Sequence, residues 1–118
     1  MWMITRYGFY SVVQSQIDKS KMMLRARDVN HLRNLQKVYS PIEGLTILSA
    51  SDTDYPYRII LTQDQWLKVA EFLAHDCTEY SNFKDAAEAQ MQDRVYDDFL
   101  HLVWAMARRM LQLPYQSK

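Results

Sequence analysis

The sequence predicts an α+β fold, in which a four-stranded, mainly antiparallel sheet carries helices on one face in the order ββα-ββα-α. Strand-like segments come in two pairs, and each pair precedes a segment with apolar residues at helical spacing. The segments of a pair are joined by short polar stretches, which favour antiparallel hairpins. A length of 118 residues suits a single domain, 1–118, with one core.

The first unit begins with residues 2–14, which we expect to form one central strand because strand formers occupy both of its faces. Within it, Gly8 marks a bulge or a close approach of the backbone. Polar residues 15–20 fit a turn, and the alternation in 21–27 predicts a second strand. Asp28 is then a suitable N-cap for a helix that ends near Tyr39, before Ser40-Pro41.

The second unit contains predicted strands at 44–50 and 57–61, separated by a turn at 52–56. Thr62 and Gln65 form a capping box at the start of the second helix. The region 83–111 is helical in pattern, and its polar middle, 90–94, offers a point where it can break into two helices. The face of the sheet away from the helices would be open or covered by a second subunit.

The composition restricts the class of protein. The formal net charge is zero, which argues against a strongly basic nucleic-acid binder. A single cysteine, Cys77, cannot form an internal disulfide, so a reducing cytoplasm is expected. The N-terminus lacks the pattern of a signal peptide, and no apolar run has membrane-spanning length, so no membrane partner is expected.

Three arginines are predicted to lie on the sheet face away from the helices. Arg25 and Arg27 are two residues apart on one strand, opposite to Leu24 and Ala26, and Arg58 alternates in the same sense on the fourth strand. Three guanidinium groups on one face can bind phosphate or carboxylate in a bidentate manner. The alternative is a solvated face on which each arginine pairs with an acidic neighbour.

A second candidate surface combines Arg6 and Tyr7 with the turn that leads to Arg58, if the two converge at one sheet edge. There Asp54 could orient a guanidinium group, while Tyr55 and Tyr57 could stack on a base or ring. In the alternative, the tyrosines pack on their own sheet, and Asp52 and Asp54 bond to nearby backbone amides.

The remaining candidates are weaker. Asn82 and Lys84, at a predicted helix start, could hold an anion, although a plain N-cap is the commoner role for Asn82 in that position. Asp97 and His101 are four residues apart on a helix and can touch, but an ion pair is commoner than a metal site. No zinc pattern and no glycine-rich phosphate loop occurs, so we expect no metal, no cofactor and no standard cofactor enzyme.

Several segments together resemble a family of small uncharacterised bacterial proteins. These are Trp2–Val13, with its Thr-Arg-Tyr-Gly-Phe core, Asp54–Arg58 and Asn82–Asp85, followed by Arg94 and His101–Trp104. The similarity covers nearly the whole chain in the same order and implies no particular activity. It does imply that the following residues belong to a family pattern: Arg6, Tyr7, Asp54, Tyr55, Arg58, Asn82 and Lys84.

The sequence therefore favours a small cytoplasmic binding or regulatory module for an anionic ligand such as a nucleotide or phosphorylated metabolite, with no catalytic residue assigned. Its predicted ligand-binding residues are Arg6, Tyr7, Arg25, Arg27, Asp54, Tyr55, Tyr57, Arg58, Asn82 and Lys84. One alternative is a structural homo-oligomer whose open sheet face meets its copy. Others are a single-strand nucleic-acid binder and a phosphate-ester hydrolase using Asp52, Asp54 or His101.

Overall fold

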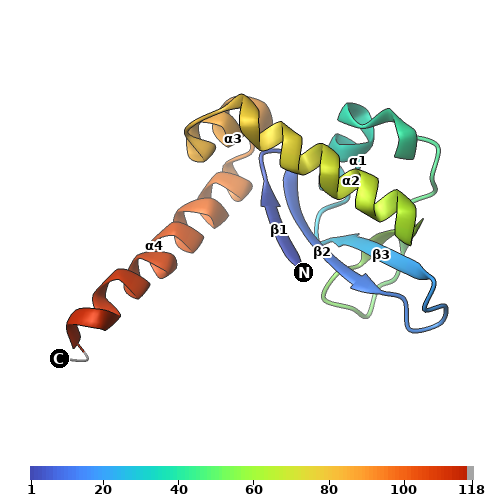
Figure 1. Cartoon of the computed structure of the whole chain (residues 1–118), viewed down its shortest axis with the longest axis horizontal. Coiled ribbons are helices and arrows are strands. Elements are labelled where there is room, and N and C mark those ends of the chain that lie inside the picture. Colours follow the sequence, from blue (N-terminus) through green and yellow to red (C-terminus); the bar gives the residue numbers. More distant parts are fainter. Residues whose placement is uncertain (117–118) are drawn as a thin grey trace.

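The structure, a computed structural model, describes residues 1–116, with side-chain surroundings described to residue 111. It is an α+β fold built on an antiparallel sheet of five strands in the spatial order β1-β2-β3-β5-β4 (Figure 1). The strands are β1 (Trp2–Thr5), β2 (Gly8–Gln14), β3 (Lys21–Ala26), β4 (Leu48–Ser49) and β5 (Tyr57–Thr62). The helices are α1 (Val29–Val38), α2 (Gln63–Asp76), α3 (Phe83–Met91) and α4 (Arg94–Gln116), with short 3-10 turns at Ser40–Ile42 and Cys77–Glu79.

The predicted first strand is two strands joined by a tight turn, so the expectation of four strands is wrong. The Thr5 hydroxyl accepts hydrogen bonds from the backbone N–H groups of Tyr7 (3.1 Å) and Gly8 (3.2 Å). Its own O–H donates to the Gly8 carbonyl at 3.0 Å. A threonine that bonds the backbone two and three residues on stabilises a turn without any proline or asparagine. The element order is therefore βββα-ββα-αα in place of ββα-ββα-α.

Gly8 confirms the prediction of a close backbone approach. A Cβ atom at this position would lie 2.5 Å from both Cβ and Cγ of His31, and the φ angle of +153° is one that L residues rarely adopt. The Phe9 N–H next to it donates to His31 Nδ1 at 3.2 Å, so α1 lies directly on the start of β2. Only glycine allows the backbone this proximity.

The main core lies between the sheet and the pair α1 and α2, as predicted. Helix α1 packs on β2, β3 and β5, while α2 packs on β3 and β5. Both predicted N-caps are confirmed: Asp28 accepts a hydrogen bond from the Asn30 N–H, and Thr62 forms a capping box with Gln65. The buried residues of this core are Tyr10, Val12, Leu24, Ala26, Leu32, Leu35, Ile42, Ile59, Leu61 and Val69.

The predicted strand at 44–50 shortens to the two residues of β4. Side-chain bonds hold the preceding segment in a different conformation, because the Gln36 amide donates to the carbonyls of Ile42 (3.0 Å) and Leu45 (2.9 Å). Since these carbonyls bond to a helix side chain, they do not join a ladder. Only Leu48 and Ser49 pair with β5.

The C-terminal helical region divides near the predicted point and lies outside the main layer. Gln92 ends α3 in the left-handed conformation at φ 50°, and Asp93 Oδ1 accepts from the N–H groups of Val95 and Tyr96 at the start of α4. Helix α4 then extends away from the sheet (Figure 1). The molecule accordingly measures 49 × 31 × 27 Å along its principal axes.

A second, smaller core joins the start of α4 to the β1–β2 hairpin. Its buried residues are Phe9, Tyr55, Ala87, Tyr96 and Leu100. Phe9 belongs to this second core, and its ring lies 5.1 Å from that of Phe99 between centroids, with 35° between the ring planes. The helices are thus not confined to one face, because the first turns of α4 cover part of the other. Among the described residues, no helix combines the length and apolar content required to span a bilayer.

Candidate functional site

Arg25 and Arg58 lie side by side on the sheet face away from α1 and α2, as predicted. They are direct cross-strand partners in the register of β3 and β5, while their neighbours Leu24 and Ile59 enter the main core. Arg27, one residue beyond β3, completes the group through a shared aromatic ring. The guanidinium carbons of Arg25 and Arg27 lie 4.7 and 4.9 Å from the centroid of the Tyr55 ring. We call Arg25, Arg27 and Arg58 the arginine cluster.

The arginine cluster is held by neutral groups. Arg25 Nη2 donates to Ser11 Oγ at 2.7 Å. Arg58 Nη2 donates to the Tyr55 carbonyl at 3.0 Å and to Thr53 Oγ1 at 3.2 Å. Within residues 1–111, no carboxylate lies at ion-pair distance from any of the three arginines. The alternative of one acidic neighbour for each arginine is therefore not what this face contains.

Two donors of the arginine cluster are buried without an acceptor. The Nε atoms of Arg25 and Arg58 are shielded from solvent, and each lacks a hydrogen-bond partner among the described residues. An unpaired buried donor of a charged group costs about 1–3 kcal/mol or more. Two like charges directly opposite one another across a pair of strands are also unfavourable. An anion beside the two guanidinium groups would relieve the repulsion between these like charges.

Tyr55 supports the arginines and is not a free stacking platform. Its side chain is 7% exposed and belongs to the second core. One contact is with Phe9, at 6.3 Å between ring centroids and 60° between planes, and the others are with Arg25 and Arg27. The ring thus holds two guanidinium groups by cation–π attraction.

Arg6 and Tyr7 form a separate cluster at the other end of the β1–β2 hairpin, around Asp76 at the end of α2. Arg6 donates from Nε (3.0 Å) and Nη2 (2.7 Å) to the two carboxylate oxygens, and the Tyr7 hydroxyl donates at 2.7 Å. The Arg6 guanidinium group also stacks on Tyr7 and Tyr80. Within residues 1–111 this cluster shares no hydrogen bond, ion pair or cation–π contact with the arginine cluster.

The charge of the Asp76 carboxylate is compensated by its own neighbours, Arg6 and Tyr7. Burial by itself raises the pKa of Asp76, but the hydrogen bonds from Arg6 and Tyr7 outweigh it, so the pKa lies below its ordinary value. Desolvation and the hydrogen bond to Asp76 raise the pKa of the Tyr7 phenol. A bidentate ion pair with a third donor is a common structural arrangement. It leaves Arg6 engaged in structure rather than available for a ligand.

The other predicted ligand residues do not converge on the arginine cluster. Asp54 is exposed in the turn before β5, and Tyr57 packs from the opposite face against the main core. Asn82 is the N-cap of α3 and accepts from the Asp85 N–H at 3.1 Å, while Lys84 is exposed. The capping role of Asn82 is thus observed.

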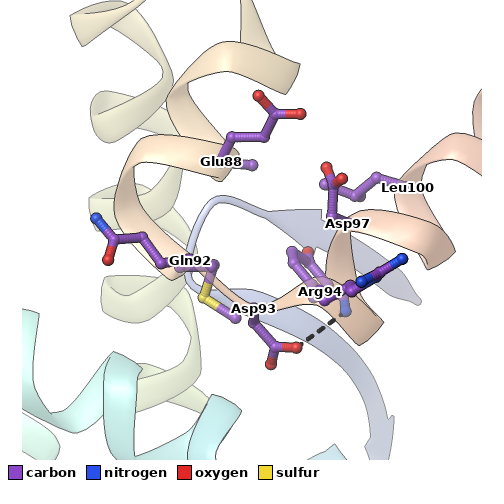
Figure 2. A pocket seen from close by; sticks show the side chains of 9 residues that line it. Glu88, Gln92, Asp93, Arg94, Asp97 and Leu100 are labelled. Carbon is purple, nitrogen blue, oxygen red and sulfur yellow. Dashed lines mark hydrogen bonds between the residues drawn. The ribbon is translucent and has the colours of Figure 1, made fainter.

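A cavity of about 410 Å³ lies where α3 meets α4 (Figure 2). Figure 2 shows the side chains of Glu88, Gln92, Asp93, Arg94 and Asp97 around its rim, with Asp93 bonded to the backbone at the start of α4. These groups belong to a helix junction and to the contact of Asp97 with His101 at 3.7 Å. The cavity contains none of the three clustered arginines.

A third polar group consists of Asp28, His31 and Asp93, whose nearest ligand atoms lie within 4.8 Å of one another. Each member already has a structural role: Asp28 and Asp93 cap helices, and His31 Nδ1 accepts the Phe9 N–H. A neutral imidazole that accepts at Nδ1 carries its proton on Nε2, the atom 3.9 Å from Asp28. That proton occupies the position a metal ion would need, so the group fits a cap junction better than a metal site.

Several contributors to these sites were not predicted. Ser11 and Thr53 bond to the arginine cluster, and Asp76 anchors Arg6. Ser11 could have been found from its position, because it shares the sheet face of Arg25 in the register of β2 and β3. Asp76 had no such signal, since it lies 70 residues from Arg6 and at the end of a different element.

A comparison with protein-family models, curated proteins and solved structures gave no significant match to this chain. The resemblance to small bacterial proteins accordingly stays a prediction, and the chemistry of the site is inferred from its own residues.

Proposed function

We propose that the protein is a binding module for a small polyanion, which it holds on the arginine cluster. The observation that supports this most strongly is the pair of adjacent guanidinium groups, Arg25 and Arg58, whose Nε donors are buried without acceptors in the described part of the chain. Arg27 adds a third positive charge in contact with the Tyr55 ring.

The chemistry of the cluster favours phosphate-type ligands. A guanidinium group presents two donors in one plane, which match two oxygens of a phosphate or carboxylate. Three such groups around one point suit a diphosphate or the phosphates of a nucleotide better than a single carboxylate. Because the Tyr55 ring is buried beneath Arg25 and Arg27, recognition falls on the charged groups of the ligand and not on stacking of a base.

Calorimetric titration tests this proposal. Inorganic pyrophosphate and a nucleoside diphosphate are titrated into the intact chain at low ionic strength, with sulfate and acetate for comparison. We expect saturable heats with the two phosphate ligands and weaker binding as salt rises, because salt screens these charges. Absence of heat and of any thermal shift with all four anions would overturn the proposal.

Variants that each remove one arginine charge, inside or outside the arginine cluster, test where the anion binds. Arg58→Gln and Arg27→Gln each remove one clustered charge, and we expect roughly tenfold or greater loss of pyrophosphate affinity from a lost charge-assisted bond. Arg33→Gln removes the same charge from an exposed position on α1 and should bind as the wild type does. Circular dichroism checks that each variant is folded. Equal losses in Arg33→Gln and Arg58→Gln would show nonspecific attraction and contradict the assignment.

A further inference from the structure

Helix α4 carries an apolar surface that the described residues leave uncovered. Its first turns pack on the second core through Tyr96 and Leu100, which are 3% and 7% exposed. Beyond Val103 its described side chains are exposed, and the helix extends away from the body of the molecule (Figure 1). Four apolar residues along one side of it are exposed by 59–79%: Val95, Leu102, Met106 and Met110. We call these four residues the α4 stripe.

The α4 stripe has the spacing of a helix–helix contact. At 100° per residue, its four members fall within a sector of roughly 80°, and they extend over about 22 Å of helix. Trp104 lies on the opposite side of the helix, where Arg108 covers its ring at 5.0 Å. Phe99, inside the same sector, and Val103, at its edge, line a hollow of about 200 Å³ with Trp2 and Ile4, and Arg27 is the charged residue of its lining. An approaching apolar helix would therefore meet a largely apolar surface.

The distribution of charge along α4 indicates which partner covers the α4 stripe. Its first half contains Asp97 and Asp98 with one arginine, and its second half contains Arg108 and Arg109 with no acid up to residue 111. Asp98 and Arg109 are eleven residues apart, about three turns, so both border the stripe on the same side. A second α4 running antiparallel would bring the Asp98 of each helix to the Arg109 of the other.

We propose that the protein forms a two-fold symmetric dimer through antiparallel pairing of the α4 stripes of two copies. With the symmetry axis close to Val103, the acidic half of each α4 lies against the basic half of the other. The same arrangement covers the stripes of both copies. In a parallel pair, the flank that carries Asp98 and Arg109 would face the opposite flank of the partner helix, so neither ion pair could form. A lipid surface suits the helix less well, because interfacial helices are rich in basic residues along the polar face, whereas the first half of α4 is acidic. The dimer does not depend on the proposed anion site.

Sedimentation equilibrium of the intact chain gives the first test. We expect a mass near twice the 14.1 kDa of one chain at micromolar concentrations. Leu102→Glu or Met106→Glu should shift it to the monomer, since each buries a charge in the proposed contact. Trp104→Gln removes an equally exposed apolar side chain from the other side of the same helix and should leave the dimer intact. A wild-type monomer throughout the range would overturn the proposal, as would equal dissociation by Trp104→Gln.

A charge exchange tests the direction of pairing. Asp98→Arg alone should weaken dimerisation roughly tenfold or more, because two ion pairs become two repulsions. The double variant Asp98→Arg/Arg109→Asp should restore most of the wild-type affinity. Failure of the double variant to recover, with helix content unchanged, would contradict antiparallel pairing. Vesicles of anionic lipid added to the wild type provide the competing outcome: a monomer that binds them through the stripe would exclude the dimer as the occupant.

Discussion

At the residue scale, a few side chains decide where the backbone can go. Thr5 closes a turn that the sequence pattern did not reveal, because threonine is also a good strand residue. Gly8, by contrast, could be assigned from the sequence, since glycine inside a strand pattern signals a bulge or close contact. The partner in that contact, His31, could not be assigned, because nothing in a single sequence links positions 23 residues apart.

Gly8→Ala tests this close approach. The added Cβ would lie 2.5 Å from His31 atoms and would hold a φ angle that alanine rarely adopts. We expect the free energy of unfolding to fall by about 2 kcal/mol or more, from overpacking and backbone strain. Urea unfolding measures it. Gly44→Ala is the control, because no atom lies within 4 Å of a Cβ there, and it should be neutral or slightly stabilising. Equal effects at both positions would refute the account.

Asp76 makes stability depend on pH in the acid range. Although burial opposes it, hydrogen bonds from Arg6 and Tyr7 set the pKa of the folded-state carboxyl below its ordinary value of 3.8. The stabilisation is thus fully present above about pH 4–5. It is lost as the pH falls through the lowered folded-state pKa. Asp76→Asn should be less stable than the wild type at pH 7, and the difference should shrink toward pH 2. A difference that stays constant over pH 2–7 in urea unfolding would contradict this.

At the element scale, the sequence predicted both capped helices and the antiparallel pairs β2–β3 and β4–β5, because each has a local signature. The β3–β5 pair, which joins the two units, has no such signature. Alternation also placed Arg25 and Arg58 on one face, which is the essential part of the candidate site. It could not separate β1 from β2, and it predicted too long a β4, because the Gln36 side chain bonds to the Leu45 carbonyl within the predicted strand.

The junction of α3 and α4 yields a prediction at this scale. Gln92 holds a left-handed conformation at φ 50°, which costs a residue with a Cβ about 1 kcal/mol relative to glycine. Gln92→Gly should therefore raise the free energy of unfolding by roughly 0.5–1 kcal/mol. Gln90→Gly, inside α3, should lower it by about 1 kcal/mol. Thermal unfolding of the two variants measures this contrast, and destabilisation by Gln92→Gly would show that the junction is held differently.

At the scale of the whole molecule, zero net charge conceals an uneven distribution. Arg6 is neutralised by Asp76, whereas Arg25, Arg27 and Arg58 have no carboxylate partner within residues 1–111. The sequence could show that these charges share a face but not which arginine is paired, because pairing depends on how α2 ends beside the β1–β2 turn. The predicted convergence of Arg6 and Tyr7 with Tyr55 therefore separates into two clusters with different chemistry.

The most direct test follows the Nε–H groups of individual arginines by nuclear magnetic resonance during a pyrophosphate titration. The buried, unpartnered Nε–H groups of Arg25 and Arg58 should shift strongly and saturably. The Nε–H of Arg6, already bonded to Asp76, should stay in place and acts as the internal control. If Arg25 and Arg58 do not shift, or if all arginines shift alike, the arginine cluster is not an anion site.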